Sequence, residues 1–119
     1  MLVGIPILIV EDEPLIALQL KALVEDVGGK VIGPVGSVRG AMELLQTEVV
    51  AAAILDIQLT DGDVTPVAQA LAAREVPVIL QSGLNPPPAL KRLFPDVIVH
   101  KKPVSGDFLI ERLAELIKR

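Results

Sequence analysis

Polar side chains suited to phosphoryl chemistry follow four short apolar runs of this sequence. They are Glu11, Asp12, Asp56, Ser82 and Lys102. A carboxylate oxygen of Asp56 can attack phosphorus and form an acyl phosphate. A cation and a lysine would neutralise the charge of the transferring group. We therefore interpret Asp56 as a phosphoacceptor, Lys102 as the lysine that contacts the phosphoryl group, and Ser82 as a hydrogen-bond donor to it.

The three acidic residues would form a cluster if the apolar runs before them are neighbouring strands. Two like charges about 5 Å apart repel by roughly 3 kcal/mol at an effective dielectric constant near 20. A divalent cation would relieve this repulsion, and a ligand set made of oxygen atoms suits Mg²⁺. We therefore predict a Mg²⁺ site that includes Glu11, Asp12 and Asp56.

The elements that must position these residues are short strands that alternate with amphipathic helices. Strands are predicted over residues 5–10, 30–35, 51–56, 76–81 and 97–99. Helices are predicted over 13–27 and 89–94, after Ser37, near Thr65-Pro66 and after Ser105, and a loop with a turn at Asp61-Gly62 is predicted over 58–63. This alternation predicts an α/β fold with a doubly wound five-stranded parallel sheet. The strands then end at one edge, where ligands bind in such sheets.

Composition narrows the class of protein. The 119 residues, 51% of them apolar, suit a single domain over 1–119 with a sizeable core. The absence of cysteine excludes disulfides and thiolate metal sites. A net charge of −4 and two aromatic residues offer no basic or stacking surface for nucleic acid. No apolar run approaches the roughly 20 residues of a membrane span, so we expect a cytoplasmic protein without a membrane partner.

Taken together and in order, these motifs resemble the receiver domain of two-component response regulators over the whole chain. The matching pieces are Ile9-Val10-Glu11-Asp12-Glu13, Leu55-Asp56, Ser82-Gly83 and Lys102-Pro103. The resemblance implies a flavodoxin-like (βα)5 fold with strand order 2-1-3-4-5. It implies a bacterial signalling switch that takes a phosphoryl group on Asp56 from a sensor histidine kinase, with Mg²⁺ bound.

The same resemblance implies further roles at the site. Asp12, Asp56 and the backbone carbonyl of Gln58 would bind Mg²⁺ with help from Glu11, and the bond between Lys102 and its following proline would be cis. Residues 10–18 and 66–71 are most similar to receivers that are paired with histidine kinases of the HWE group.

Several positions depart from the family pattern. Glu11 lengthens one member of the acidic pair, and Thr60 stands where many receivers have proline. Val99 and Leu84 are not aromatic, which argues against a switch that swings an aromatic ring. Three prolines at 86–88 precede the fourth helix, so we expect a reshaped output face.

The end of the sequence shapes the expected output. One helix follows Lys102, so we expect no output domain. Signalling would then pass through an unknown downstream protein, through self-association, or through use as a phosphate sink. We expect either a monomer or a dimer that forms on phosphorylation. The phosphorylated form would lose its phosphoryl group slowly, without turnover of external substrates.

Alternative functions remain open. Residues 56–60 imitate the Asp-x-Asp-x-Thr signature of haloacid dehalogenase phosphatases, but Gln58 cannot act as a general acid or base. A nucleotide or flavin binder would need a glycine-rich or hydroxyl-rich loop after the first strand, and this loop is acidic. A degenerate receiver that acts by docking alone is a further alternative.

Each motif also has a simpler interpretation. Asp12 and Glu13 before a proline could cap a helix, and Ser82-Gly83 could be a turn. His100 is interpreted as a solvated histidine rather than a phosphorylation site. The phosphoacceptor interpretation is preferred because it accounts for all of these residues together.

Overall fold

The chain folds around a parallel sheet that matches the predicted topology. The computed structural model describes residues 2–82, 87–95, 99–101 and 106–118. In this part of the chain, five parallel strands lie in the order β2-β1-β3-β6-β7. They are β1 (Pro6–Val10), β2 (Lys30–Val35), β3 (Ala52–Asp56), β6 (Val78–Ser82) and β7 (Val99–Lys101). The flavodoxin-like fold class and the strand order 2-1-3-4-5 are confirmed, with β6 and β7 as the fourth and fifth strands.

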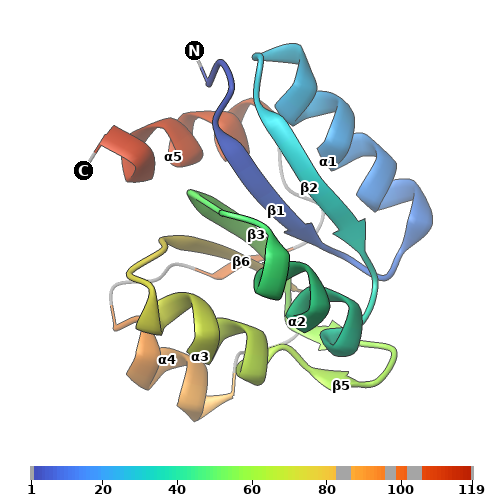
Figure 1. The fold of residues 1–119 in the computed structure, drawn as a ribbon, viewed down its shortest axis with the longest axis vertical. Coiled ribbons are helices and arrows are strands. Elements are labelled where there is room, and N and C mark those ends of the chain that lie inside the picture. Colours follow the sequence, from blue (N-terminus) through green and yellow to red (C-terminus); the bar gives the residue numbers. More distant parts are fainter. Residues whose placement is uncertain (1, 83–86, 96–98, 102–105, 119) are drawn as a thin grey trace.

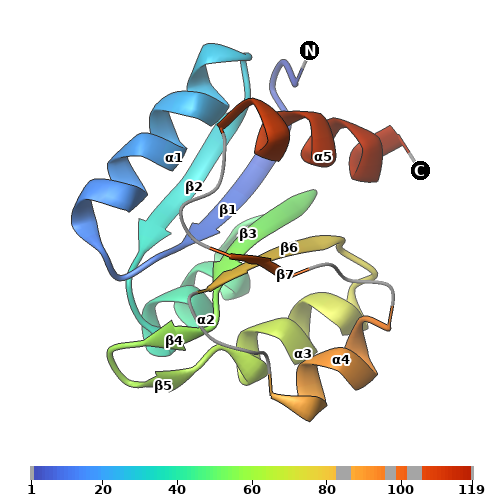
Figure 2. The ribbon, with the colours of Figure 1, turned by 180° about the vertical axis from the view of Figure 1, so that it is seen from behind.

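Helices cover both faces of this sheet (Figures 1 and 2). The helices on one face are α1 (Pro14–Asp26) and α5 (Gly106–Lys118). Those on the other face are α2 (Val38–Thr47), α3 (Thr65–Ala73) and α4 (Pro88–Leu93). No described helix has both the length and the continuous apolar character that crossing a lipid bilayer requires.

Alternating side chains of each central strand divide the core into two layers. On β1, Ile7 and Ile9 pack with the residues of α1 and α5, whereas Leu8 and Val10 pack with those of α2 and α3. All four side chains are fully buried. Burial on both faces explains why the strands read as continuous apolar runs rather than alternating ones.

The predicted starts of two helices are confirmed. Ser37 is the N-cap of α2, and its Oγ accepts a hydrogen bond of 2.9 Å from the backbone N–H of Gly40. Pro66 lies in the first turn of α3, where a missing N–H costs no helical hydrogen bond. The predicted cap of the last helix, Ser105, lies outside the described residues.

The fifth strand differs from its predicted range of 97–99. Its described part is Val99–Lys101, so His100 lies within the strand rather than just past it. His100 pairs with Gln81, and Lys101 pairs with Ser82. Backbone pairing with β6 therefore extends this strand beyond the apolar run.

A small hairpin replaces the loop that was predicted over 58–63. The antiparallel strands β4 (Gln58–Leu59) and β5 (Gly62–Asp63) pair with each other across a tight turn. Gly62 has a φ of +138°, which suits glycine at this turn. The hairpin leads directly from the end of β3 to the start of α3.

Candidate metal and phosphoacceptor site

Three polar residues lie side by side at the carboxyl edge of the sheet. Asp56 pairs with Gln81 of β6, and Val10 pairs with Leu55, so Glu11 follows beside Asp56. The exposed fractions of Glu11, Asp56 and Gln81 are 2%, 5% and 2%. Buried polar side chains normally have hydrogen-bond partners, so we expect these three side chains to make polar contacts at this edge of the sheet.

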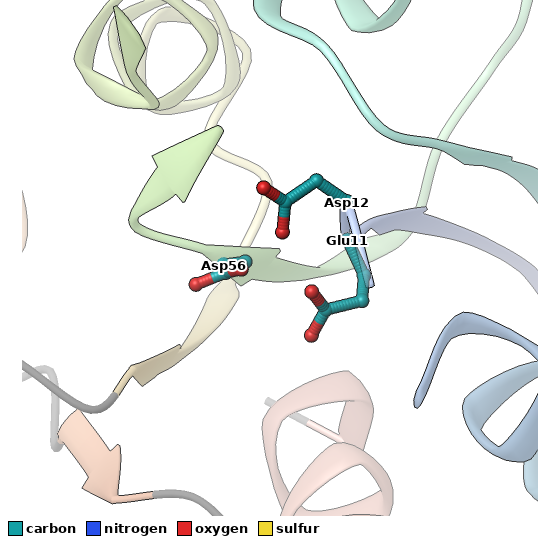
Figure 3. A group of neighbouring side chains, drawn as sticks. All are labelled: Glu11, Asp12 and Asp56. Carbon is teal, nitrogen blue, oxygen red and sulfur yellow. The ribbon is translucent and has the colours of Figure 1, made fainter. Parts of the chain in front are cut away.

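The structure brings Glu11, Asp12 and Asp56 together as one acidic cluster. One carboxylate oxygen from each residue lies within 4.8 Å of the others. Figure 3 shows the side chains of Glu11 and Asp12 extending from the end of β1 toward Asp56 at the end of β3. At this spacing each pair of charges repels by about 3 kcal/mol at an effective dielectric constant near 20. Oxygen ligands of this number and charge fit a hard divalent cation such as Mg²⁺. Their role as metal ligands stays a prediction.

The Glu11 carboxylate is oriented by hydrogen bonds at both oxygens. Its Oε2 accepts a bond of 3.1 Å from the backbone N–H of Glu13, and its Oε1 accepts one of 3.4 Å from Nε2 of Gln81. The backbone N–H of Glu11 donates to the carbonyl of Val35 at 2.8 Å. Although Glu13 is the N-cap residue of α1, its side chain makes no capping hydrogen bond within the described part of the chain. Capping of α1 by the Glu13 side chain therefore does not account for the acidic residues 11–13.

The hairpin after Asp56 is attached to the segment that follows β2. Thr60 Oγ1 donates to the carbonyl of Gly36 at 3.3 Å. The Asp61 carboxylate accepts 2.7 Å and 3.1 Å hydrogen bonds from the backbone N–H groups of Val38 and Arg39. These bonds, the one from Val38 most strongly, hold the pKa of Asp61 below its ordinary value. The turn predicted at Asp61 is present, and its long-range contacts have no signal in the local sequence.

Asp63 attaches the other side of the hairpin to α3. Its Oδ1 accepts a hydrogen bond of 2.8 Å from the backbone N–H of Thr65. Hydrogen bonds from the Thr65 side chain and backbone lower the pKa of the Asp63 carboxyl. The backbone N–H of Val64 also donates to the carbonyl of Ile57 at 2.9 Å, which closes the base of the hairpin.

Of the remaining predicted site residues, Gln58 and Ser82 lie in described strands and Lys102 does not. Gln58 is exposed and begins β4, two residues after Asp56. Ser82 is the last residue of β6, next to Gln81. Lys102, its bond to Pro103 and Leu84 lie outside the described residues. The roles predicted for Gln58, Ser82 and Lys102 therefore stay predictions.

Gln81 is a further site residue, beyond those predicted from the sequence. Its position at the polar end of an apolar strand is the signal that could have identified it. The register with β3 decides that its side chain reaches Glu11.

Comparison with known proteins gives a family match over most of the chain. The model of the response regulator receiver domain matches residues 7–113. The phyllosphere-induced regulator PhyR of Methylorubrum extorquens is 46% identical over 76 residues, which cover 61% of this chain and 28% of PhyR. The chain thus spans well under half the length of this curated relative.

Solved structures agree with the family match. The BeF3-activated conformation of SdrG from Pseudomonas melonis Fr1 is 39% identical, covers 98% of this chain and 99% of SdrG, and superposes with a TM-score of 0.74. The receiver domain of the sensor histidine kinase PA1611 from Pseudomonas aeruginosa PAO1, with magnesium coordinated in its active site cleft, has a TM-score of 0.79. It is 23% identical, covers 98% of this chain and 99% of that chain, and shows the shared fold alone.

Proposed function

This chain belongs to the response regulator receiver domain family, and on that premise we propose that it is a phosphorylation-controlled signalling switch whose phosphoacceptor is Asp56. The observation that carries the proposal is the cluster of Glu11, Asp12 and Asp56 at the carboxyl edge of the sheet. Two of these carboxylates, Glu11 and Asp56, are buried, and like charges held this close are costly for a fold unless a cation or a reaction uses them.

The proposed reaction transfers a phosphoryl group from a phosphohistidine of a sensor kinase. An oxygen of Asp56 attacks phosphorus, the new O–P bond forms, and the N–P bond of the donor breaks. The imidazole leaves as the neutral ring when its other nitrogen carries a proton. The product is an acyl phosphate on Asp56, which water later hydrolyses to regenerate the carboxylate.

The residues around Asp56 have complementary roles in this proposal. Mg²⁺, when held by Glu11, Asp12, Asp56 and the Gln58 carbonyl, supplies charge neutralisation at the phosphoryl oxygens. Lys102 would neutralise the same group, and Ser82 would donate a hydrogen bond to it. The contacts of Glu11 with Gln81 and Glu13 support the proposal because they fix one carboxylate before any ion arrives.

Signalling would follow from a change in charge at the site. An aspartyl phosphate adds negative charge and three acceptor oxygens. If Ser82 moves toward them, the segment before α4 moves as well, and the surface formed by α4, β7 and α5 changes. A downstream protein responds when it binds the two states with different affinity. We propose that the chain meets both partners, a sensor kinase and a downstream protein, in the cytoplasm.

The competing functions have less support. A haloacid dehalogenase phosphatase is not favoured, because the family match is to receivers and Gln58 replaces the second aspartate of that signature. A receiver that acts by docking alone would have no use for three clustered carboxylates.

Addition of Mg²⁺ and beryllium fluoride, a phosphoryl mimic, tests the proposal in solution. Backbone amide resonances of the wild type should change near Asp56 and also on α4 and α5. The Asp56→Asn variant should show neither change, whereas Asp26→Asn, which changes an exposed aspartate at the end of α1, should respond like the wild type. No response in the wild type would support docking alone, and changes confined to the sheet edge would refute the switch.

A further inference from the structure

We propose that Thr60 and Asp61 are positioning residues for the phosphoacceptor site. They connect the hairpin after Asp56 to the segment beside Asp12 through three hydrogen bonds, which we call the hairpin tie. Its members are the bonds from Thr60 to Gly36, from Val38 to Asp61 and from Arg39 to Asp61. This inference rests on the proposed function of the site and adds the residues that fix its geometry.

The hairpin has one side chain in the core, Leu59, and is joined to α3 through Asp63, but its tip has little local support. Its two strands have two residues each, and Gln58, Gly62 and Asp63 are exposed. An isolated two-stranded hairpin is marginally stable at best in water. Because Gln58 lies in this hairpin, the position of its carbonyl relative to Asp56 depends on what holds the hairpin in place.

The tie adds an attachment of the hairpin tip over a long distance in sequence. Asp61 lies 23 residues after Val38 and accepts its backbone N–H at 2.7 Å, and the neighbouring N–H of Arg39 is accepted at 3.1 Å. Bonds to an ionised carboxylate are stronger than neutral ones, and a negative charge is favoured at a helix N-terminus. Helix α2 already has Ser37 as its N-cap, so the bonds of Asp61 also serve to attach the hairpin to the start of this helix.

The other end of the tie lies against the acidic cluster. A Cβ atom added to Gly36 would lie 3.2 Å from the Cα of Asp12, so these two backbones are in close contact. One residue earlier, the carbonyl of Val35 accepts the N–H of Glu11 at 2.8 Å. The path from Asp56 through the hairpin, the tie and Gly36 therefore returns to Asp12. Asp12 and Asp56 are therefore connected in two ways, through the pairing of β1 with β3 and through the hairpin tie.

A cation site with this construction should lose affinity when the tie is cut. Partners that orient metal ligands from outside typically change metal affinity by about 10- to 100-fold. The tie is exposed to solvent, where single hydrogen bonds contribute less, so we expect a rise of roughly three- to tenfold in the Kd for Mg²⁺.

Three variants of the protein separate the tie from the stability of α2. Asp61→Ala removes two bonds of the tie, and Thr60→Val removes the third without changing shape. Ser37→Ala removes the cap of α2 and leaves the tie intact. Titration with Mg²⁺, followed by amide resonances, should give a raised Kd for the first two variants and a Kd within twofold of the wild type for Ser37→Ala. An unchanged Kd for Asp61→Ala, or an equal rise for Ser37→Ala, would overturn the inference.

A second measurement needs no metal. In metal-free protein, Asp61→Ala should shift the amide resonances of Gly36, Asp12 and Gln58 and speed hydrogen exchange at Val64, whose N–H closes the hairpin. Changes confined to the former donors of the tie would show a simple helix cap and overturn the inference. If the wild type binds no Mg²⁺, the proposed function fails, and the metal-free spectra still decide whether the tie connects the hairpin to Asp12.

Discussion

Gln81 Nε2 lies 3.4 Å from Glu11 Oε1, and this buried contact spans the strand that ends in Asp56. Glu11 directly follows β1 and Gln81 lies in β6, and these two strands flank β3. The Gln81 amide therefore helps to orient the Glu11 carboxylate of the acidic cluster.

Replacement of Gln81 by leucine should destabilise the metal-free protein. The change keeps the side-chain size but leaves Glu11 without its amide donor in a buried place, which costs about 1–3 kcal/mol. Urea unfolding measures this free energy. Gln69→Leu, on the exposed side of α3, is the matched control and should change it by less than about 0.5 kcal/mol. Equal stability of Gln81→Leu and the wild type would show that the contact is unimportant.

Replacement of Asp12 by asparagine should have opposite effects on stability and metal binding. Removal of one of three clustered charges relieves repulsion, so the unfolding free energy of the metal-free protein should rise by about 1 kcal/mol. The Kd for Mg²⁺ should rise at least tenfold, because a charged ligand is lost. Urea unfolding with and without Mg²⁺ tests both statements. A variant that is less stable than the wild type without Mg²⁺ would contradict the repulsion argument.

The hairpin tie should weaken in acid. Its hydrogen bonds lower the pKa of Asp61 in the folded state, so its stabilising contribution is fully present above the unfolded pKa of about 3.9. The contribution is lost as the pH falls through the lower, folded pKa. The amide resonance of Val38 should therefore titrate with a midpoint below about 3.9, and this titration should disappear in Asp61→Asn. A midpoint at or above that value would show that the bonds do not hold the carboxylate.

The acidic cluster could be predicted from the sequence because its geometry follows from the topology. Apolar runs that end abruptly in acids mark strand ends, and parallel neighbouring strands end at one edge. This logic places Glu11 and Asp12 near Asp56 without knowledge of any loop.

The hairpin tie could not be predicted in the same way. Asp61-Gly62 is a common turn pair, and nothing local indicates that the carboxylate bonds to α2 more than twenty residues earlier. The role of Gln81 depends equally on the register between β3 and β6, which an apolar run does not specify. The bounds of the edge strand β7 depend on pairing with β6 rather than on its own side-chain pattern.

The most direct test of the account is the intact mass of the protein after incubation with acetyl phosphate and Mg²⁺. The wild type should gain one phosphoryl group, and so should the matched control Asp26→Asn, which changes an exposed aspartate at the end of α1. The Asp56→Asn variant should gain none, and the wild type should gain none when Mg²⁺ is removed by a chelator. A gain of the same mass by Asp56→Asn would contradict the assignment of Asp56 as the phosphoacceptor.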